Sequence, residues 1–238
     1  METPPGRAGL HIPPVEVIST TLLVDGLAAP LALVTFTIGL DSFRITDTRS
    51  QHEDTDFVSV SLAVGNKPSV SQTRSLGNVN NGTHPINLSF PNVKIAPNET
   101  AVLTYSMVNA GHQPPDAVTK ALQAGTDSLT QKAAQIAATA AGSAIGEALG
   151  ASIGTAAVPL IGTALGALAG WVVGGAFGLI LADCDGPVAA GVHVLTYAQI
   201  KASIEGGHGL TQTDEHPGVD SNDGCGGNSH YFVTWSVR

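Results

Sequence analysis

The sequence predicts an α+β fold, in which an antiparallel β-sandwich is interrupted by a long Gly/Ala-rich helical hairpin. Two observations lead to this prediction. Segments with strand-like alternation or many β-branched residues occupy both ends of the chain and are separated by polar loops. Between them, residues 133–182 carry a single charge, at Glu147, and regularly spaced glycines. We expect the C-terminal strands to complete the sheet that the N-terminal strands begin.

These signals divide the chain into three parts. Residues 1–14 are rich in Pro and Gly and are expected to form a flexible arm. Residues 15–112 and 186–238 are expected to form the sandwich, and residues 113–185 the hairpin. An alternative has the strands after Asp183 forming a separate small sheet.

The strand predictions rest on β-branched content and on alternation. In residues 57–64, apolar side chains alternate with Ser59 and Ser61, so one face is apolar and the other polar. Residues 65–85 read as a polar loop. The predicted strands are 15–24, 31–40, 43–48, 57–64, 86–90, 93–95, 100–108, 188–200 and 231–237.

The helical part begins after a proline pair. Asp116 follows Pro114 and Pro115 and is a candidate N-cap. Pro159 lies inside the apolar run and predicts the start of a second helix, antiparallel to the first. That second helix, residues 160–182, would be about 35 Å long, which matches a bilayer core of roughly 30 Å.

Glycine recurs at every fourth position in the apolar segment, so each series lies on one helical face. The first series is Gly142, Gly146, Gly150 and Gly154, and the second is Gly162, Gly166, Gly170, Gly174 and Gly178. Glycine lowers helix stability by roughly 0.8–1 kcal/mol relative to alanine. The pattern therefore favours close helix contacts of the small-xxx-small kind found in membranes. We expect Trp171 and Phe177 to anchor the helix in lipid or in a core.

On these residues, the segment 133–182 resembles the glycine-zipper segments of membrane-inserting proteins, and its character is similar to the hydrophobic hairpin of pore-forming colicins. The resemblance implies a toxin-like protein that inserts into a lipid membrane and forms a pore as a homo-oligomer. Glu147 is the candidate pH trigger, because neutralising a carboxylate removes most of its transfer cost. The alternative is a non-enzymatic structural or interaction protein, whose hairpins form the core of a soluble homo-oligomer.

The charge balance restricts the partners. Ten Lys and Arg against 19 Asp and Glu give a net charge of −9, and no basic cluster is present, which argues against nucleic acid. The first residues lack the basic start and apolar run of a classical signal peptide. We expect the protein to be cytoplasmic before release, to be released or secreted without such a signal, and then to act at a target membrane.

Acidic residues gather around the third and fourth predicted strands. The candidate ligands are Asp47, Glu53, Asp54 and Asp56. Carboxylates at one end of a sandwich can hold Ca²⁺, and the alternative reading is solvated loop carboxylates. This cluster supports a further alternative function, a calcium-dependent module that binds sugar or lipid. No other cofactor is expected.

The C-terminal part is rich in His and holds both cysteines. Its histidines are His193, His208, His216 and His230; they follow no zinc spacing and are candidate pH sensors. In an oxidising compartment we expect Cys184 and Cys225 to form a disulfide. The sequence has neither a phosphate-binding loop nor a nucleophile elbow, so we do not expect an enzyme.

Overall fold

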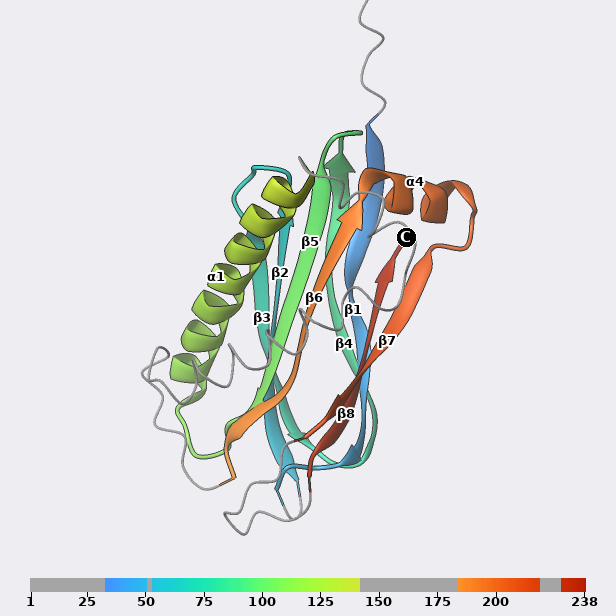
Figure 1. Cartoon of the computed structure of the whole chain (residues 1–238). Helices are drawn as coiled ribbons and strands as arrows, with labels where there is room; N and C mark the ends of the chain where they lie inside the picture. Colours follow the sequence, from blue (N-terminus) through green and yellow to red (C-terminus); the bar gives the residue numbers. More distant parts are fainter. Residues whose placement is uncertain (1–32, 51–52, 142–183, 219–227) are drawn as a thin grey trace, which may run out of the picture. The chain divides into compact units, whose positions relative to one another are not determined.

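The described part of this computed structural model is mostly β and comprises residues 33–50, 53–141, 184–218 and 228–238 (Figure 1). Within these ranges the strands form two antiparallel sheets of four strands each. Sheet A has the order β4-β1-β8-β7, and sheet B has the order β3-β2-β5-β6. The strands of sheet A are β1 (Val34–Asp47), β4 (Gly82–Ile95), β7 (Leu210–Pro217) and β8 (His230–Val237). The strands of sheet B are β2 (Asp54–Val64), β3 (Val70–Val79), β5 (Thr100–Asn109) and β6 (Gly186–Thr196).

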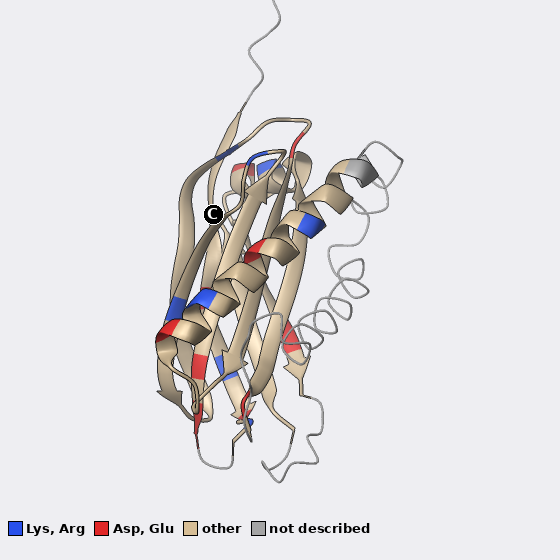
Figure 2. Ribbon diagram, turned by 90° about the vertical axis from the view of Figure 1, so that its left-hand side faces the viewer, with Lys and Arg blue, Asp and Glu red and all other residues tan. Residues whose placement is uncertain are grey.

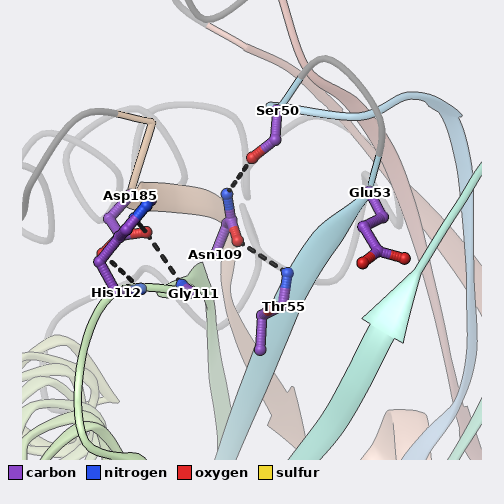
Figure 3. A pocket seen from close by; sticks show the side chains of 7 residues that line it. All are labelled: Ser50, Glu53, Thr55, Asn109, Gly111, His112 and Asp185. Atoms are coloured by element: carbon purple, nitrogen blue, oxygen red, sulfur yellow. Dashed lines mark hydrogen bonds and ion pairs between the residues drawn. The ribbon is translucent and has the colours of Figure 1, made fainter.

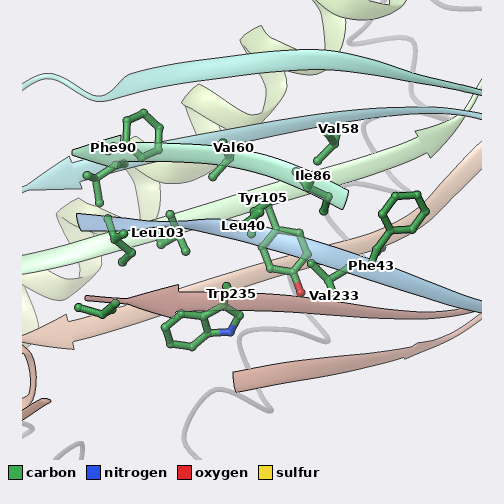
Figure 4. Packing of buried hydrophobic residues seen from close by; sticks show 14 of the residues in the cluster. Leu40, Phe43, Val58, Val60, Ile86, Phe90, Leu103, Tyr105, Val233 and Trp235 are labelled. Atoms are coloured by element: carbon green, nitrogen blue, oxygen red, sulfur yellow. The ribbon is translucent and has the colours of Figure 1, made fainter. Parts of the chain in front are cut away.

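The main core lies between the two sheets, where their inner side chains interdigitate (Figure 4). β2 and β5 illustrate why these residues form strands. Val58 and Val60 of β2 and Leu103 of β5 point into this core. The residues next to each of them along its own strand point to the outer face of sheet B. Other buried members of the core include Leu40, Phe43, Ile86, Tyr105, Val233 and Trp235.

The predicted fold class is wrong. Besides the strands, the described residues hold two helices, α1 (Pro115–Ala141) and α4 (Tyr197–Glu205), and no long helical hairpin is shown. α1 lies along the outer face of sheet B (Figures 1 and 2), because its apolar stripe, including Val118 and Leu122, packs on outer-face residues of the strands. Residues 142–183 lie outside the described part.

No helix of the described ranges combines the length and apolar character that crossing a membrane requires. The proposed N-cap also needs correction. α1 already includes Pro115, so Asp116 lies in its first turn. The carbonyl of Pro114 accepts from the backbone N–H groups of Ala117 and Val118.

Several predicted strand boundaries are wrong as well. The segments 31–40 and 43–48 belong to one strand, β1, with a register shift between Leu40 and Ser42. β3 lies inside the predicted polar loop, because a half-exposed edge strand tolerates polar side chains on both faces. β6 ends at Thr196, where a capping box with Gln199 starts α4.

The strands after residue 183 are shared between the sheets. β6 lies in sheet B, and β7 and β8 lie in sheet A, so among the described residues no separate small sheet forms. The predicted strand 15–24 lies outside the described part.

Candidate functional site

The chain leaves sheet B and returns to it at one point. In the register of β5 with β6, Asn109 faces Gly186. Residues 110–185, which we call the insert, therefore connect two neighbouring antiparallel strands. α1 is the helix of the insert that the structure describes.

Asp185 joins the two ends of the insert. Its carboxylate accepts from the backbone N–H of Gly111 at 2.9 Å and of His112 at 3.3 Å, and its Oδ1 lies 3.1 Å from His112 Nδ1. The Asp185 side chain is only 1 % exposed, so these charge-assisted bonds are shielded from water. The insert thus begins and ends at a fixed base.

A cavity of about 340 Å³ lies beside this base (Figure 3). Asn109 forms its floor: the side-chain oxygen accepts from the N–H of Thr55 at 2.8 Å, and the amide nitrogen donates to Ser50 Oγ at 2.9 Å. Glu53 lies on one side of this floor, with its Oε1 accepting from Asn78 at 2.6 Å. The lining residues are Ser50, Glu53, Thr55, Asn109, Gly111, His112 and Asp185.

The strand that follows the insert is fixed by Arg49. Its Nε donates to the carbonyl of Cys184 at 2.8 Å, and its guanidinium lies over Gly186, where a Cβ would come within 2.7 Å of it. Cys184 takes part in a disulfide. Cys225 lies outside the described residues.

Under α1, sheet B carries a strip of buried hydroxyl side chains, which we call the hydroxyl strip. It consists of Ser59, Ser61, Thr104 and Ser106, all fully buried. Asp127 of α1 accepts from Ser61 at 2.9 Å, from Ser69 at 3.2 Å and from Ser71. The hydroxyl oxygens of Thr104 and Ser106 have no hydrogen-bond partner among the described residues. Sequence reasoning placed Ser59 and Ser61 on a polar face and predicted a helix after Pro115, but it did not predict that this helix packs on sheet B and buries them.

Apolar contacts of α1 flank the hydroxyl strip. Near its start, Val118 and Leu122 pack with Phe57 and Val108. Further along α1, the contacts involve mainly small side chains; the buried members are Val102, Ala133, Ala137 and Val192. The helix therefore rests on sheet B through modest apolar clusters separated by hydroxyl groups.

The predicted Ca²⁺ ligands do not meet at one point. Asp54 and Asp56 point inward, where Tyr231 Oη lies 2.6 Å and 2.9 Å from their carboxylates. Burial and the neighbouring Asp54 charge raise the pKa of Asp56 well above its ordinary value. Glu53 lines the cavity, and Asp47 is exposed. No group of three or more His, Cys, Asp or Glu suited to a metal is present in the described part of the chain.

Two of the predicted histidines meet between the sheets. His193 donates from Nε2 to Asp214 at 2.7 Å, and Tyr105 donates its O–H to the same carboxylate oxygen at 2.5 Å. His216 Nε2 lies 2.8 Å from the Tyr105 oxygen. Gly191 provides room for the ring, since a Cβ there would lie 2.4 Å from Tyr105.

Burial shifts the pKa values of the side chains in this interior cluster. It lowers the pKa of His216 to about 4, and it raises the pKa of Tyr105, which also lies beside the Asp214 charge. Burial also opposes ionisation of Asp214, but the hydrogen bond and charge of His193 keep the pKa of this carboxyl below its ordinary value. Asp214 and His216 share one face of β7, a spacing that sequence reasoning missed because it predicted no strand between residues 200 and 231.

The remaining candidates are scattered. His230 lies 2.8 Å from Glu215, and His208 is exposed. The zipper glycines, Glu147, Trp171 and Phe177 lie within residues 142–183, outside the described part.

No family model, curated protein or solved structure matches the chain.

Proposed function

We propose that this protein is a toxin-like, non-enzymatic carrier that stores the insert against a β-sandwich and delivers the insert's glycine-rich segment into a lipid membrane as a homo-oligomer. The observation that carries the proposal is the closed base, at which Asn109 faces Gly186. Because the insert starts and ends at adjacent strands, it can move away without unpairing sheet B.

The sandwich core does not depend on the insert. The main core is built from the strands and from Ile200 of α4, and none of the described α1 side chains belongs to it. α1 contributes only to the two smaller clusters on the outer face of sheet B. We therefore expect the sandwich to persist when α1 leaves.

The hydroxyl strip lowers the energy needed to uncover sheet B. Serine and threonine hydroxyls regain hydrogen bonds to water when exposed, and a buried hydroxyl without a partner costs about 1–3 kcal/mol. Large apolar side chains such as Leu122 oppose the release of α1. Each stabilises the bound helix by roughly 1.5–3 kcal/mol when buried. Few such side chains hold α1 on sheet B, so a modest favourable free energy is enough to release the helix.

The sequence after α1 supplies that favourable free energy. Residues 148–182 contain no charged side chain. Transfer of their apolar surface into lipid is worth about 25 cal/mol per Å². A helical segment can enter lipid because its backbone polar groups stay hydrogen-bonded to each other.

Dye release from liposomes at neutral and acid pH tests this proposal. We expect the wild-type chain to release dye, and the double variant Gly166→Leu/Gly170→Leu to release none while its circular dichroism retains the β signal. If wild type leaves the vesicles sealed at both pH values, insertion is refuted. Light scattering then tests the second candidate, since a stable oligomer indifferent to liposomes would support a soluble assembly.

A further inference from the structure

The cavity at the base of the insert has a rigid floor. Asn109 is 2 % exposed, and its side chain bonds to the backbone of Thr55, to Ser50 and, at 3.2 Å, to the carbonyl of Cys184. Three segments distant in the sequence are thereby fixed around one space. Such preorganisation reduces the entropy lost when a ligand binds.

The two walls present hydrogen-bond acceptors. Glu53 bonds through Oε1 to Asn78, and no described residue bonds its Oε2. On the other side, His112 is 56 % exposed and its Nδ1 faces Asp185. Since a carboxylate only accepts, Nδ1 carries a proton, which leaves Nε2 as the ring nitrogen that can accept from a ligand when it is unprotonated. Figure 3 shows Glu53 and His112 on opposite sides of Asn109.

The floor presents a donor. Ser50 Oγ already accepts from Asn109, which directs its O–H away from that amide. A ligand for this cavity therefore needs donors for the two walls and an acceptor for Ser50. An anion lacks the donors and is repelled by Glu53 and Asp185, whereas an ammonium group offers no acceptor. Hydroxyl groups donate and accept at once.

We infer that this cavity binds a small polyhydroxylated molecule of the saccharide class, without calcium. Its volume, about 340 Å³, lies at the lower end of the range for ligand pockets. Glu53 and His112 accept from ligand hydroxyls, and Ser50 donates to one. Asp185 is a positioning residue, because both its oxygens are occupied within the base of the insert. This site is independent of membrane insertion.

The test is saturation-transfer NMR and calorimetric titration of the full chain in EDTA, with methyl glucoside, methyl galactoside, methyl mannoside and N-acetylglucosamine. We expect at least one to bind with a Kd near 1 mM. Glu53→Gln should weaken that binding about tenfold, because it replaces a charged acceptor. Ser50→Ala provides a second variant should Glu53→Gln fail to fold. Glu205→Gln, at an exposed position of α4, is the matched control and should bind as wild type does.

Three results would overturn the assignment. The first is that no glycoside binds at about 10 mM. The second is that a folded Glu53→Gln or Ser50→Ala variant binds as tightly as wild type. The third is that methylammonium binds at this cavity while the glycosides do not.

Discussion

Asn109, the last residue of β5, faces Gly186, the first residue of β6. The residues between them form an insert that begins and ends at one place, and Asp185 bonds both of its ends together. This arrangement separates the chain into a sandwich with its own core and an insert that is attached to it at one place. It also creates the polar cavity beside the base.

Asp185→Asn should loosen the base of the insert. The variant loses a buried charge that accepts from Gly111 and His112, so we expect the free energy of unfolding to fall by about 1–3 kcal/mol. Hydrogen exchange should quicken at residues 111–118. Asp116→Asn, in the exposed first turn of α1, is the control, and equal exchange in the two variants would contradict the role of Asp185.

Asp54 and Asp56 should respond oppositely to replacement by Asn. Asp54 accepts from the backbone N–H groups of Arg49 and Ser50, so Asp54→Asn should destabilise by about 2 kcal/mol. The pKa of Asp56 is raised in the folded state, so this residue contributes stability at low pH that is lost as pH rises through its folded pKa. Asp56→Asn should therefore stabilise the protein at pH 7. Denaturant unfolding of the two variants tests this prediction, and destabilisation by both would contradict it.

Because of His216, the free energy of unfolding should depend on pH between about 6.5 and 4. Its pKa falls from 6.5 to about 4 on folding, so below pH 6.5 the unfolded state binds a proton that the folded state does not. The resulting loss of stability grows to roughly 3 kcal/mol as pH falls to 4. His216→Gln should abolish this contribution, measured as the difference between the two proteins' unfolding free energies at several pH values. Parallel pH profiles would exclude it.

Gly191→Ala should destabilise by about 1–3 kcal/mol, because the added Cβ would lie 2.4 Å from the buried Tyr105 ring. Gly111→Ala is the matched control, since its Cβ would meet Thr55 Oγ1 at 3.4 Å. Thermal unfolding of both variants distinguishes crowding from a general effect of replacing glycine. Similar losses would argue against the packing of Tyr105 over Gly191.

Local patterns predicted some parts of the fold. The alternation in residues 57–64 and the β-branched segment 100–108 lie within β2 and β5. The fold class was nevertheless wrong, because helical propensity after Pro115 does not say whether a helix packs on another helix or on a sheet. Buried serines such as Ser59 look solvent-facing in a sequence until α1 covers them.

The sites depend on contacts that no local pattern contains. Tyr105 and Asp214 meet across 109 residues, and His112 meets Asp185 across 73. The register of β5 with β6 brings the latter pair together, so the base and the cavity appear only with the sheet. The cluster of acidic residues did single out Glu53, but as a calcium ligand. In the structure Glu53 lines the cavity instead.

The most direct test of the stored insert is the rate of dye release by Asp127→Asn. This change weakens the bonds from Ser61, Ser69 and Ser71 that hold α1 on sheet B. We predict several-fold faster release than with wild type, whereas Asp116→Asn, on the same helix but away from the hydroxyl strip, should match wild type. Equal rates for Asp127→Asn and Asp116→Asn, or no release by any of the three proteins, would contradict the account.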